Sequence, residues 1–297
     1  MYIGPHVPLN DTFLSTVTQM KDSPYGLIQI FMGPPIGYHI RRTTDEVLEQ
    51  TGKFLAKNNK KLYVHAPYVI NLASQDETIL SRGRKSIQKI LDTQSTINNY
   101  GVKDSKSNAS LTGTVLHIGA KGPLSQVINE INDLSIFNIE DAENTKNSTK
   151  LYLENAAQNK LGNTWDDIRK LCEGIDSQNI GFCIDTCHTH SSGLANMRDP
   201  EEVVKLFDDL DMCGKSGKAG KPVCVHLNDS KTKFKSKQDI HSVLGYGSIW
   251  DIDKPESFES LYTLLDICKS ENYDIILETP SATEQLNYEF EIFKSFV

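Results

Sequence analysis

The sequence predicts an α/β protein with a single domain, a (β/α)8 barrel that spans residues 1–297. Short apolar runs typical of strands alternate with longer segments of helical spacing. Eight such runs occur, which suits a closed parallel barrel better than an open doubly wound sheet. No shift in composition and no long linker rich in Pro, Gly or Ser divides the chain.

The first four expected strands are the apolar runs at residues 2–7, 27–31, 61–66 and 113–118. After the second and third runs, apolar residues recur three and four positions apart, which is the spacing of one helix face. Helices are therefore expected at residues 44–58 and 77–100.

The last four expected strands are at residues 150–155, 180–185, 222–227 and 274–278, with helices at 165–177 and 201–212. The polar stretch 133–147 is expected to be a loop, and residues 213–220 a turn. That turn contains Gly-Lys-Ser, but the first glycine of a phosphate-binding loop is missing and no helix is expected to follow. These two differences exclude a P-loop.

Histidines and carboxylates occur at or just after six consecutive strand ends, most clearly where Asp185 and His188 follow an apolar run. Chemistry in such barrels lies at the carboxyl ends of the strands. A lone histidine at a strand end is more often structural, but burying so many charged groups together is costly without cations. These residues are typical ligands of zinc. The pattern predicts a hydrolase with several metal ions.

Composition excludes some classes of protein. The net charge of −8 argues weakly against a polyanionic partner, yet basic clusters occur, among them Lys231, Lys233, Lys235 and Lys237. Six scattered cysteines favour reduced thiols in an intracellular, cytoplasmic or nuclear protein. Cys183 and Cys187 are expected to be structural. We expect no signal peptide and no transmembrane helix.

Three motifs resemble the endonuclease IV family of apurinic/apyrimidinic (AP) endonucleases, which are zinc-dependent DNA repair enzymes with a TIM-barrel fold. They are His65-x-x-Tyr68-x-x-Asn71-Leu72, the stretch 181–188, and His226-x-Asn228-Asp229-Ser230-Lys231 followed by Asp239-x-His241. The resemblance covers essentially the whole chain.

The resemblance implies three zinc ions per chain. One ion would be held by His65, His117 and Glu154. A second would be held by Glu154, Asp185, His226 and Glu278, and a third by His188, Asp239 and His241. His6 is expected just behind the ligands, and His39 and His190 are expected to have no role.

The implied reaction is hydrolysis of the phosphodiester on the 5′ side of an abasic site in duplex DNA, leaving a 3′-hydroxyl and a 5′-deoxyribose phosphate. Glu154, Asp185 and Glu278 would form the catalytic centre, and a water shared by the metals would become the nucleophile. Blocked 3′ ends are a further implied substrate. We expect a monomer with neither a nucleotide cofactor nor a membrane partner.

DNA contacts are implied for Tyr68 and Val69, which match the family position that enters the base stack, and for the four lysines from Lys231 to Lys237. Tyr68 has an alternative role, packing over the rim of the barrel. The family usually has glycine where Lys235 stands, and an arginine of the family is absent around residues 34–36.

Two other functions compete with a nuclease. A sugar isomerase or epimerase of the xylose-isomerase type would need one metal on Glu154, Asp185, His226 and Glu278, and would not need the other five ligands. A non-catalytic protein that binds damaged DNA would be favoured by loss of a ligand, and none is lost.

Overall fold

The strands of the protein form one parallel sheet that curls into a barrel. The computed structural model describes residues 1–103, 111–134, 149–216, 219, 223–279 and 283–294. Eight strands pair in the order β1-β10-β7-β6-β5-β4-β3-β2. The strands are β1 (Ile3–Pro5), β2 (Leu27–Phe31), β3 (Lys61–His65), β4 (Thr112–His117), β5 (Lys150–Glu154), β6 (Ile180–Asp185), β7 (Val223–His226) and β10 (Asp274–Leu277). A parallel bridge from His6 to Gln29 joins β1 to β2 at the seam, which confirms the predicted barrel.

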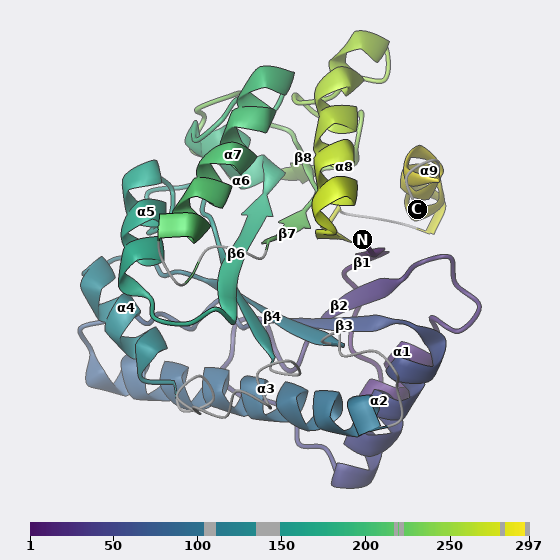
Figure 1. Ribbon diagram of the computed structural model, residues 1–297, viewed down its shortest axis with the longest axis vertical. Coiled ribbons are helices and arrows are strands. Elements are labelled where there is room, and N and C mark those ends of the chain that lie inside the picture. Colours follow the sequence, from purple (N-terminus) through teal and green to yellow (C-terminus); the bar gives the residue numbers. More distant parts are fainter. Residues whose placement is uncertain (104–110, 135–148, 217–218, 220–222, 280–282, 295–297) are drawn as a thin grey trace.

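Helices lie outside the strands (Figure 1). They are α1 (Phe13–Thr18), α2 (Asp45–Asn58), α3 (Glu77–Lys103), α4 (Leu124–Asn132), α5 (Trp165–Gly174), α6 (Thr186–Ser192), α7 (Pro200–Ser216), η3 (Pro255–Phe258), α8 (Glu259–Glu271) and α9 (Thr283–Phe293). Several begin at a side-chain cap, as where Thr44 accepts a hydrogen bond from the Val47 amide at 3.4 Å and starts α2.

The apolar core has two parts. A large cluster fills the space between the strands and the outer helices. A smaller cluster, which includes Tyr63, Val115 and Tyr152, contains one buried side chain from each of seven strands. Below it, the Tyr63 hydroxyl and the Lys61 ammonium bind Asp274 at 2.7 and 2.6 Å. The interior is therefore filled, as is usual in barrels of this class.

Two short elements decorate the rim at the carboxyl ends of the strands. The strands β8 (Asp229–Ser230) and β9 (His241–Ser242) pair in antiparallel fashion. They bracket the excursion 231–240, which carries the lysine series and Asp239. Helix α6 follows β6 without a loop, because Asp185 is both the last residue of the strand and the N-cap of the helix.

Most expected elements have the predicted bounds to within a few residues, with two differences. Residues Cys213–Ser216 were expected to be in a turn but belong to α7, where Lys215 pairs with Asp211 at 2.5 Å and extends the helix by a turn. Helix α5 ends at Gly174 instead of residue 177, because Ile175 is already extended. Most of the expected loop at 133–147 lies outside the described residues.

Among the described residues, every helix is too short or too polar to cross a bilayer.

Candidate metal centre

The histidines and carboxylates from the strand ends meet around one cavity at the rim of the barrel. The cavity measures about 330 Å³. Seven of the nine predicted ligands line it, namely His65, His117, Glu154, His188, Asp239, His241 and Glu278. Asp185 and His226, which are fully buried, lie directly behind this lining within reach of Glu154, Glu278 and His241.

Glu154 lies at the centre of the group. Its Oε2 atom lies 3.1 Å from His65 Nε2 and 3.4 Å from His117 Nδ1. Its Oε1 atom lies 3.3 Å from both His188 Nδ1 and His226 Nδ1. One carboxylate thus faces four imidazoles, an arrangement that suits a ligand shared between two ions.

A second group forms where the β8–β9 excursion returns to the rim. His188 Nε2 lies 3.1 Å from Asp239 Oδ2, and His241 Nε2 lies 3.2 Å from Asp239 Oδ1. The other nitrogen of His188 bonds the carbonyl of Asn155 at 2.9 Å, which fixes the ring and leaves Nε2 facing Asp239.

Polar residues behind the ligands hold them in place. Asp185 Oδ1 accepts the His188 amide at 2.7 Å, and its Oδ2 accepts the side chain of Asn228 at 2.7 Å. Gln29 receives the His226 Nε2 hydrogen at 3.1 Å and donates to Glu278 Oε1 at 2.6 Å. These contacts set which nitrogen or oxygen of each ligand faces the cavity.

The electrostatics are those of many acids and imidazoles packed together. Burial raises the pKa of Glu154 and Glu278, but the surrounding histidines outweigh burial and hold both values well below the usual range. Burial opposes protonation of His188 and His241, yet neighbouring carboxylates, Asp185 foremost, raise their pKa values to about 10 and about 9. The imidazolium form thus compensates for the crowded acids.

The donor atoms fit bound metal ions. Five sets of ligand atoms from the described residues lie within 4.8 Å of one another, and three of them are His65 with His117 and Glu154; Glu154 with Asp185, His226 and Glu278; and His188 with Asp239 and His241. These are the three predicted sets. Moreover, the buried atoms His117 Nδ1 and His241 Nε2 have no hydrogen-bond partner among the described residues, although carboxylate oxygens lie 3.4 and 3.2 Å away. Such unsatisfied nitrogens are expected where a cation completes the site.

The two cysteines differ in their surroundings. Cys183 lies in the small inner cluster of the barrel, as expected for a structural residue. Cys187 Sγ lies within 4.8 Å of ligand atoms of Asp185 and His241, so geometry alone would allow it to contact a metal. Burial raises the pKa of Cys187 to about 12, which keeps the thiol neutral when no metal is present.

Tyr68 and Val69 lie on the rim beside the cavity. Tyr68 is 53 % exposed, and its ring packs against Phe31, His65 and His117 with centroid distances of 5.3 to 5.5 Å. The amide of Tyr68 also donates to the carbonyl of Pro35 at 2.8 Å, which joins the loops after β2 and β3. Val69 is half-buried, and its carbonyl accepts the Tyr38 hydroxyl.

The four lysines of the excursion have exposed side chains. Lys237 nevertheless donates its ammonium to the carbonyl of Ser192 at 2.6 Å, so this group is bound within the protein. Lys235 has a φ of +62° and Lys237 a φ of +60°. A positive φ is the conformation that glycine adopts most readily, which is compatible with the glycine that the family resemblance implies at the position of Lys235.

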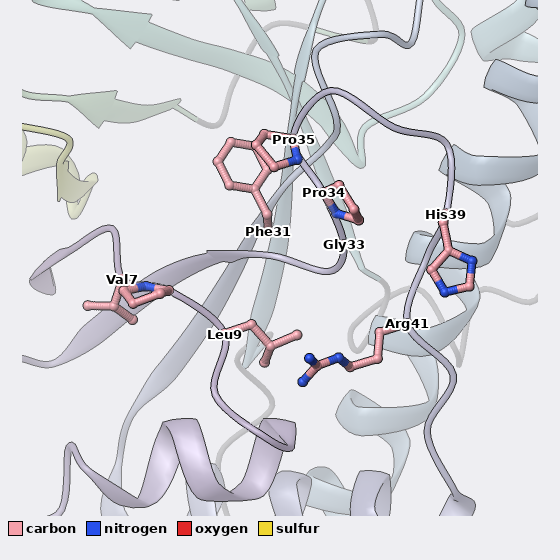
Figure 2. A pocket seen from close by; sticks show the side chains of 9 residues that line it. Val7, Leu9, Phe31, Gly33, Pro34, Pro35, His39 and Arg41 are labelled. Carbon is pink, nitrogen blue, oxygen red and sulfur yellow. The ribbon is translucent and has the colours of Figure 1, made fainter.

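A second hollow lies on the other side of Phe31 (Figure 2). It measures about 540 Å³ and is lined mainly by apolar side chains of the segments that follow β1 and β2. Figure 2 shows the Phe31 ring beside Pro35, and Arg41 pointing toward Leu9. Because Phe31 also packs on His65 at 5.1 Å, it forms a wall between this hollow and the metal cavity.

The remaining histidines lie in three different surroundings. His6 Nδ1 lies 3.0 Å from the Gln29 amide and 3.4 Å from Glu278, directly behind the ligands. His39 is exposed and lines the second hollow. His190 is buried against Phe234 at 5.3 Å, and burial lowers its pKa to about 4.

Sequence reasoning missed four residues of the site. Gln29, Asn155 and Asn228 orient ligands, and Lys160 lines the cavity. Asn155 and Asn228 each follow directly on a predicted ligand or lie two residues from one, which is the signal that could have identified them. Gln29 is a buried polar residue within an apolar strand, which is also unusual. Lys160 has no comparable signal.

Known proteins resemble this chain in sequence and in fold. The chain is similar to the probable endonuclease 4 of Malacoplasma penetrans (strain HF-2), with 26% identity over 98% of this chain and 95% of that protein. The fold is that of endonuclease IV from Thermus thermophilus, with a TM-score of 0.77, 20% identity and coverage of 100% and 98% of the two chains. A D-tagatose 3-epimerase-like protein also shares the fold, with a TM-score of 0.63, 19% identity and coverage of 100% and 97%.

The resemblance to endonuclease IV indicated by the sequence motifs is thereby confirmed. The family model described as xylose isomerase-like TIM barrel matches residues 17–296, and the chain belongs to that family.

Proposed function

We propose that this protein is a zinc-dependent AP endonuclease, which hydrolyses the phosphodiester 5′ to an abasic site in duplex DNA. The observation that carries the proposal is the presence of three adjoining ligand sets instead of one. Glu154 belongs to two of these sets and so connects them. Blocked 3′ ends are a second substrate class within the same proposal. The barrel of residues 1–297 would act as one domain and as a monomer.

The charge of the site favours an anionic substrate. Four carboxylates contribute −4, and three zinc ions would contribute +6, which leaves about +2. When bound, zinc ions polarise phosphate oxygens and lower the pKa of water. The protein's own contribution is to fix the ligand atoms: Asn228 and Gln29 hold Asp185 and Glu278 in the orientation that faces the cavity.

The rim supplies features suited to a bent or opened duplex. A cavity this deep cannot reach a sugar inside an intact duplex, so the abasic nucleotide must be extruded. Tyr68 lines the cavity and is 53 % exposed, and its amide binds the carbonyl of Pro35, which precedes the 79 % exposed Ile36; Tyr68 and Ile36 would offset unstacking of bases. Lys231, Lys233 and Lys235 lie on the excursion that carries Asp239 and would meet the DNA backbone.

The alternative function is that of a sugar epimerase with one metal on Glu154, Asp185, His226 and Glu278. The same barrel supports it, since an epimerase-like protein shares the fold. The set formed by His188, Asp239 and His241 counts against it, because one metal does not require a second group of ligands at the rim.

One experiment separates the two functions. The purified protein is incubated with a duplex that contains one tetrahydrofuran abasic mimic, without added magnesium, and with a panel of ketohexoses. We expect a cut immediately 5′ to the mimic, and about three zinc per chain by elemental analysis. Epimerised sugar without a nicked strand would favour the alternative and reject the nuclease.

A further inference from the structure

Lys160 is the one lysine or arginine among the described residues that line the metal cavity. It lies in the turn after β5 and lines the cavity, and its charge acts on His117. The turn is fixed at both ends, because the Ala156 amide donates to Gly162 at 3.2 Å and the Leu161 amide donates to Gly119 at 3.1 Å. Lys160 is therefore presented to the cavity by an ordered turn beside β4.

The ammonium of Lys160 has no partner within the described part of the chain that would explain its position. Some lysines there form ion pairs, such as Lys61 with Asp274 and Lys170 with Asp166, whereas Lys160, like the exposed Lys121, forms none. A lysine ammonium offers three donors and no acceptor, so Lys160 is available to bind an anion that enters the cavity.

Asn71 adds a second donor at the same edge of the cavity. Its Oδ1 accepts the amides of Ala73 and Ala120 at 3.2 and 3.3 Å, which fixes the side-chain amide. With Oδ1 engaged, Nδ2 is the polar atom that Asn71 offers to the cavity it lines. Two donors from different loops thus lie at one edge.

The two donors lie at the mouth of the cavity and not on its floor. His65 and Glu154 are 1 % exposed, whereas Lys160 and Asn71 are only half-buried. A phosphate that reaches the buried ligands leaves the rest of its strand at the mouth. The next phosphate of that strand is an anion with free oxygens, and it suits a lysine and an amide donor.

We propose that Lys160 and Asn71 form a phosphate subsite that binds the phosphodiester adjoining the scissile one on the same DNA strand. This inference rests on the proposed nuclease function and specifies how its substrate is held. The subsite positions the strand through backbone contacts and reads no base.

The test combines protein variants with single neutral phosphates. Lys160→Met and Asn71→Asp are compared with the full-length wild type on abasic duplexes in which the phosphate 5′ or 3′ to the scissile one is replaced by a methylphosphonate. Asn71→Asp keeps the acceptor oxygen and removes the donor. Lys160→Arg tests rescue by charge, and Lys121→Met is the matched control, because Lys121 is an exposed lysine on the same rim that does not line the cavity.

We expect Lys160→Met to raise KM roughly tenfold with kcat little changed, to lower the salt dependence of binding by about one phosphate, and to retain its zinc. In the wild type, one of the two methylphosphonates should raise KM by a similar factor. In Lys160→Met, the same methylphosphonate should leave KM almost unchanged. Lys160→Arg should recover most of the binding, and Lys121→Met should keep the methylphosphonate effect.

The outcomes are distinguishable. A wild type that nicks abasic DNA beside a Lys160→Met that binds equally well overturns the subsite and leaves the nuclease intact. The subsite is also overturned if Lys160→Met loses the same amount of DNA binding whether the 5′ or the 3′ phosphate is neutral, because the contact is then non-specific. A wild type that neither binds nor cuts abasic DNA rejects the nuclease and the subsite together.

Discussion

Gln29 donates a hydrogen bond of 2.6 Å from its side-chain amide to Oε1 of Glu278. The oxygen of the same amide lies 3.1 Å from His226 Nε2, so one fully buried glutamine in β2 orients ligands from β7 and from the end of β10. It lies at the seam of the barrel, where β1 and β2 meet through the bridge to His6.

Replacing Gln29 by leucine should weaken zinc binding. Loss of a partner behind a ligand usually costs about 10–100-fold in metal affinity, and the mutation leaves both Glu278 and His226 without their orienting contact. Competition with a chromogenic chelator measures the change. Gln50→Leu, on the outer helix α2, is the control and should bind zinc as the wild type does. Equal affinities for the wild type and Gln29→Leu would show that the ligands are oriented by other contacts.

Glu278→Gln should abolish cutting and leave most DNA binding. The amide keeps the shape of the side chain but removes one negative charge and one metal-ligand oxygen, whereas the rim residues that would contact DNA remain. Nicking of the abasic duplex and a gel shift report the two properties separately. Glu256→Gln, an exposed carboxylate of η3, should behave as the wild type. Substantial nicking by Glu278→Gln would remove Glu278 from the catalytic group.

The stability of the metal-free protein should fall as the pH rises from about 6.5 to about 10. Burial opposes protonation of His188 and His241, but Asp185 and its neighbours raise their pKa values to about 10 and about 9. A histidine whose pKa is higher in the folded protein than in the unfolded chain stabilises the fold at low pH. This contribution is lost as the pH rises through the pKa of the folded protein. Thermal melting after chelation measures the trend.

The stabilisation of the protein by zinc should increase with pH above about 6.5. A histidine must lose its proton to bind a metal, so the stabilisation by zinc should grow with pH. The difference in melting temperature between loaded and metal-free protein should therefore widen from about pH 6.5 to about pH 9. A constant difference would mean that the two histidines are already neutral in the metal-free site.

Lys235→Gly should stabilise the fold. Lys235 has a φ of +62°, a conformation that costs a residue with a side chain roughly 1 kcal/mol. Glycine avoids that cost but gains entropy in the unfolded chain, so we expect a net gain of a few tenths of a kcal/mol. Urea unfolding of the metal-loaded protein measures it. Lys233→Gly, at a neighbouring residue without a positive φ, should destabilise the fold, and a gain there would indicate another cause.

The strands were predictable because each is a short, mainly apolar run, and most of them end in, or directly precede, a polar residue of the rim. Ile180–Asp185 and Leu27–Phe31 have the predicted bounds, and the first strand is shorter than expected because it pairs only over Ile3–Pro5 and a bridge at His6. Helix ends were less predictable, since the pair formed by Asp211 and Lys215 extends α7 beyond the point where glycine suggested a turn.

The candidate ligands could be identified from residue type and from their position after strands, whereas the contacts that orient them could not. Gln29 reaches Glu278 across 249 positions of sequence, and no local pattern encodes such a contact. Lys160 belongs to a turn whose shape depends on the hydrogen bond that the Leu161 amide donates to Gly119 in the loop after β4. The contact of Lys237 with Ser192 could likewise not be predicted from the sequence, because it depends on how the excursion folds against α6.

One carboxylate oxygen of Asp185 caps the N-terminus of α6, and the other accepts a hydrogen bond from Asn228. The same residue is also a candidate metal ligand. The interval of three residues to His188 is therefore the interval of an N-cap to the amide it accepts. An inserted or deleted residue between them would break the cap and move both side chains at once. Length is consequently more constrained here than side-chain identity: the side chain at Cys187 can change in an evolving lineage, but the number of residues between the two ligands cannot.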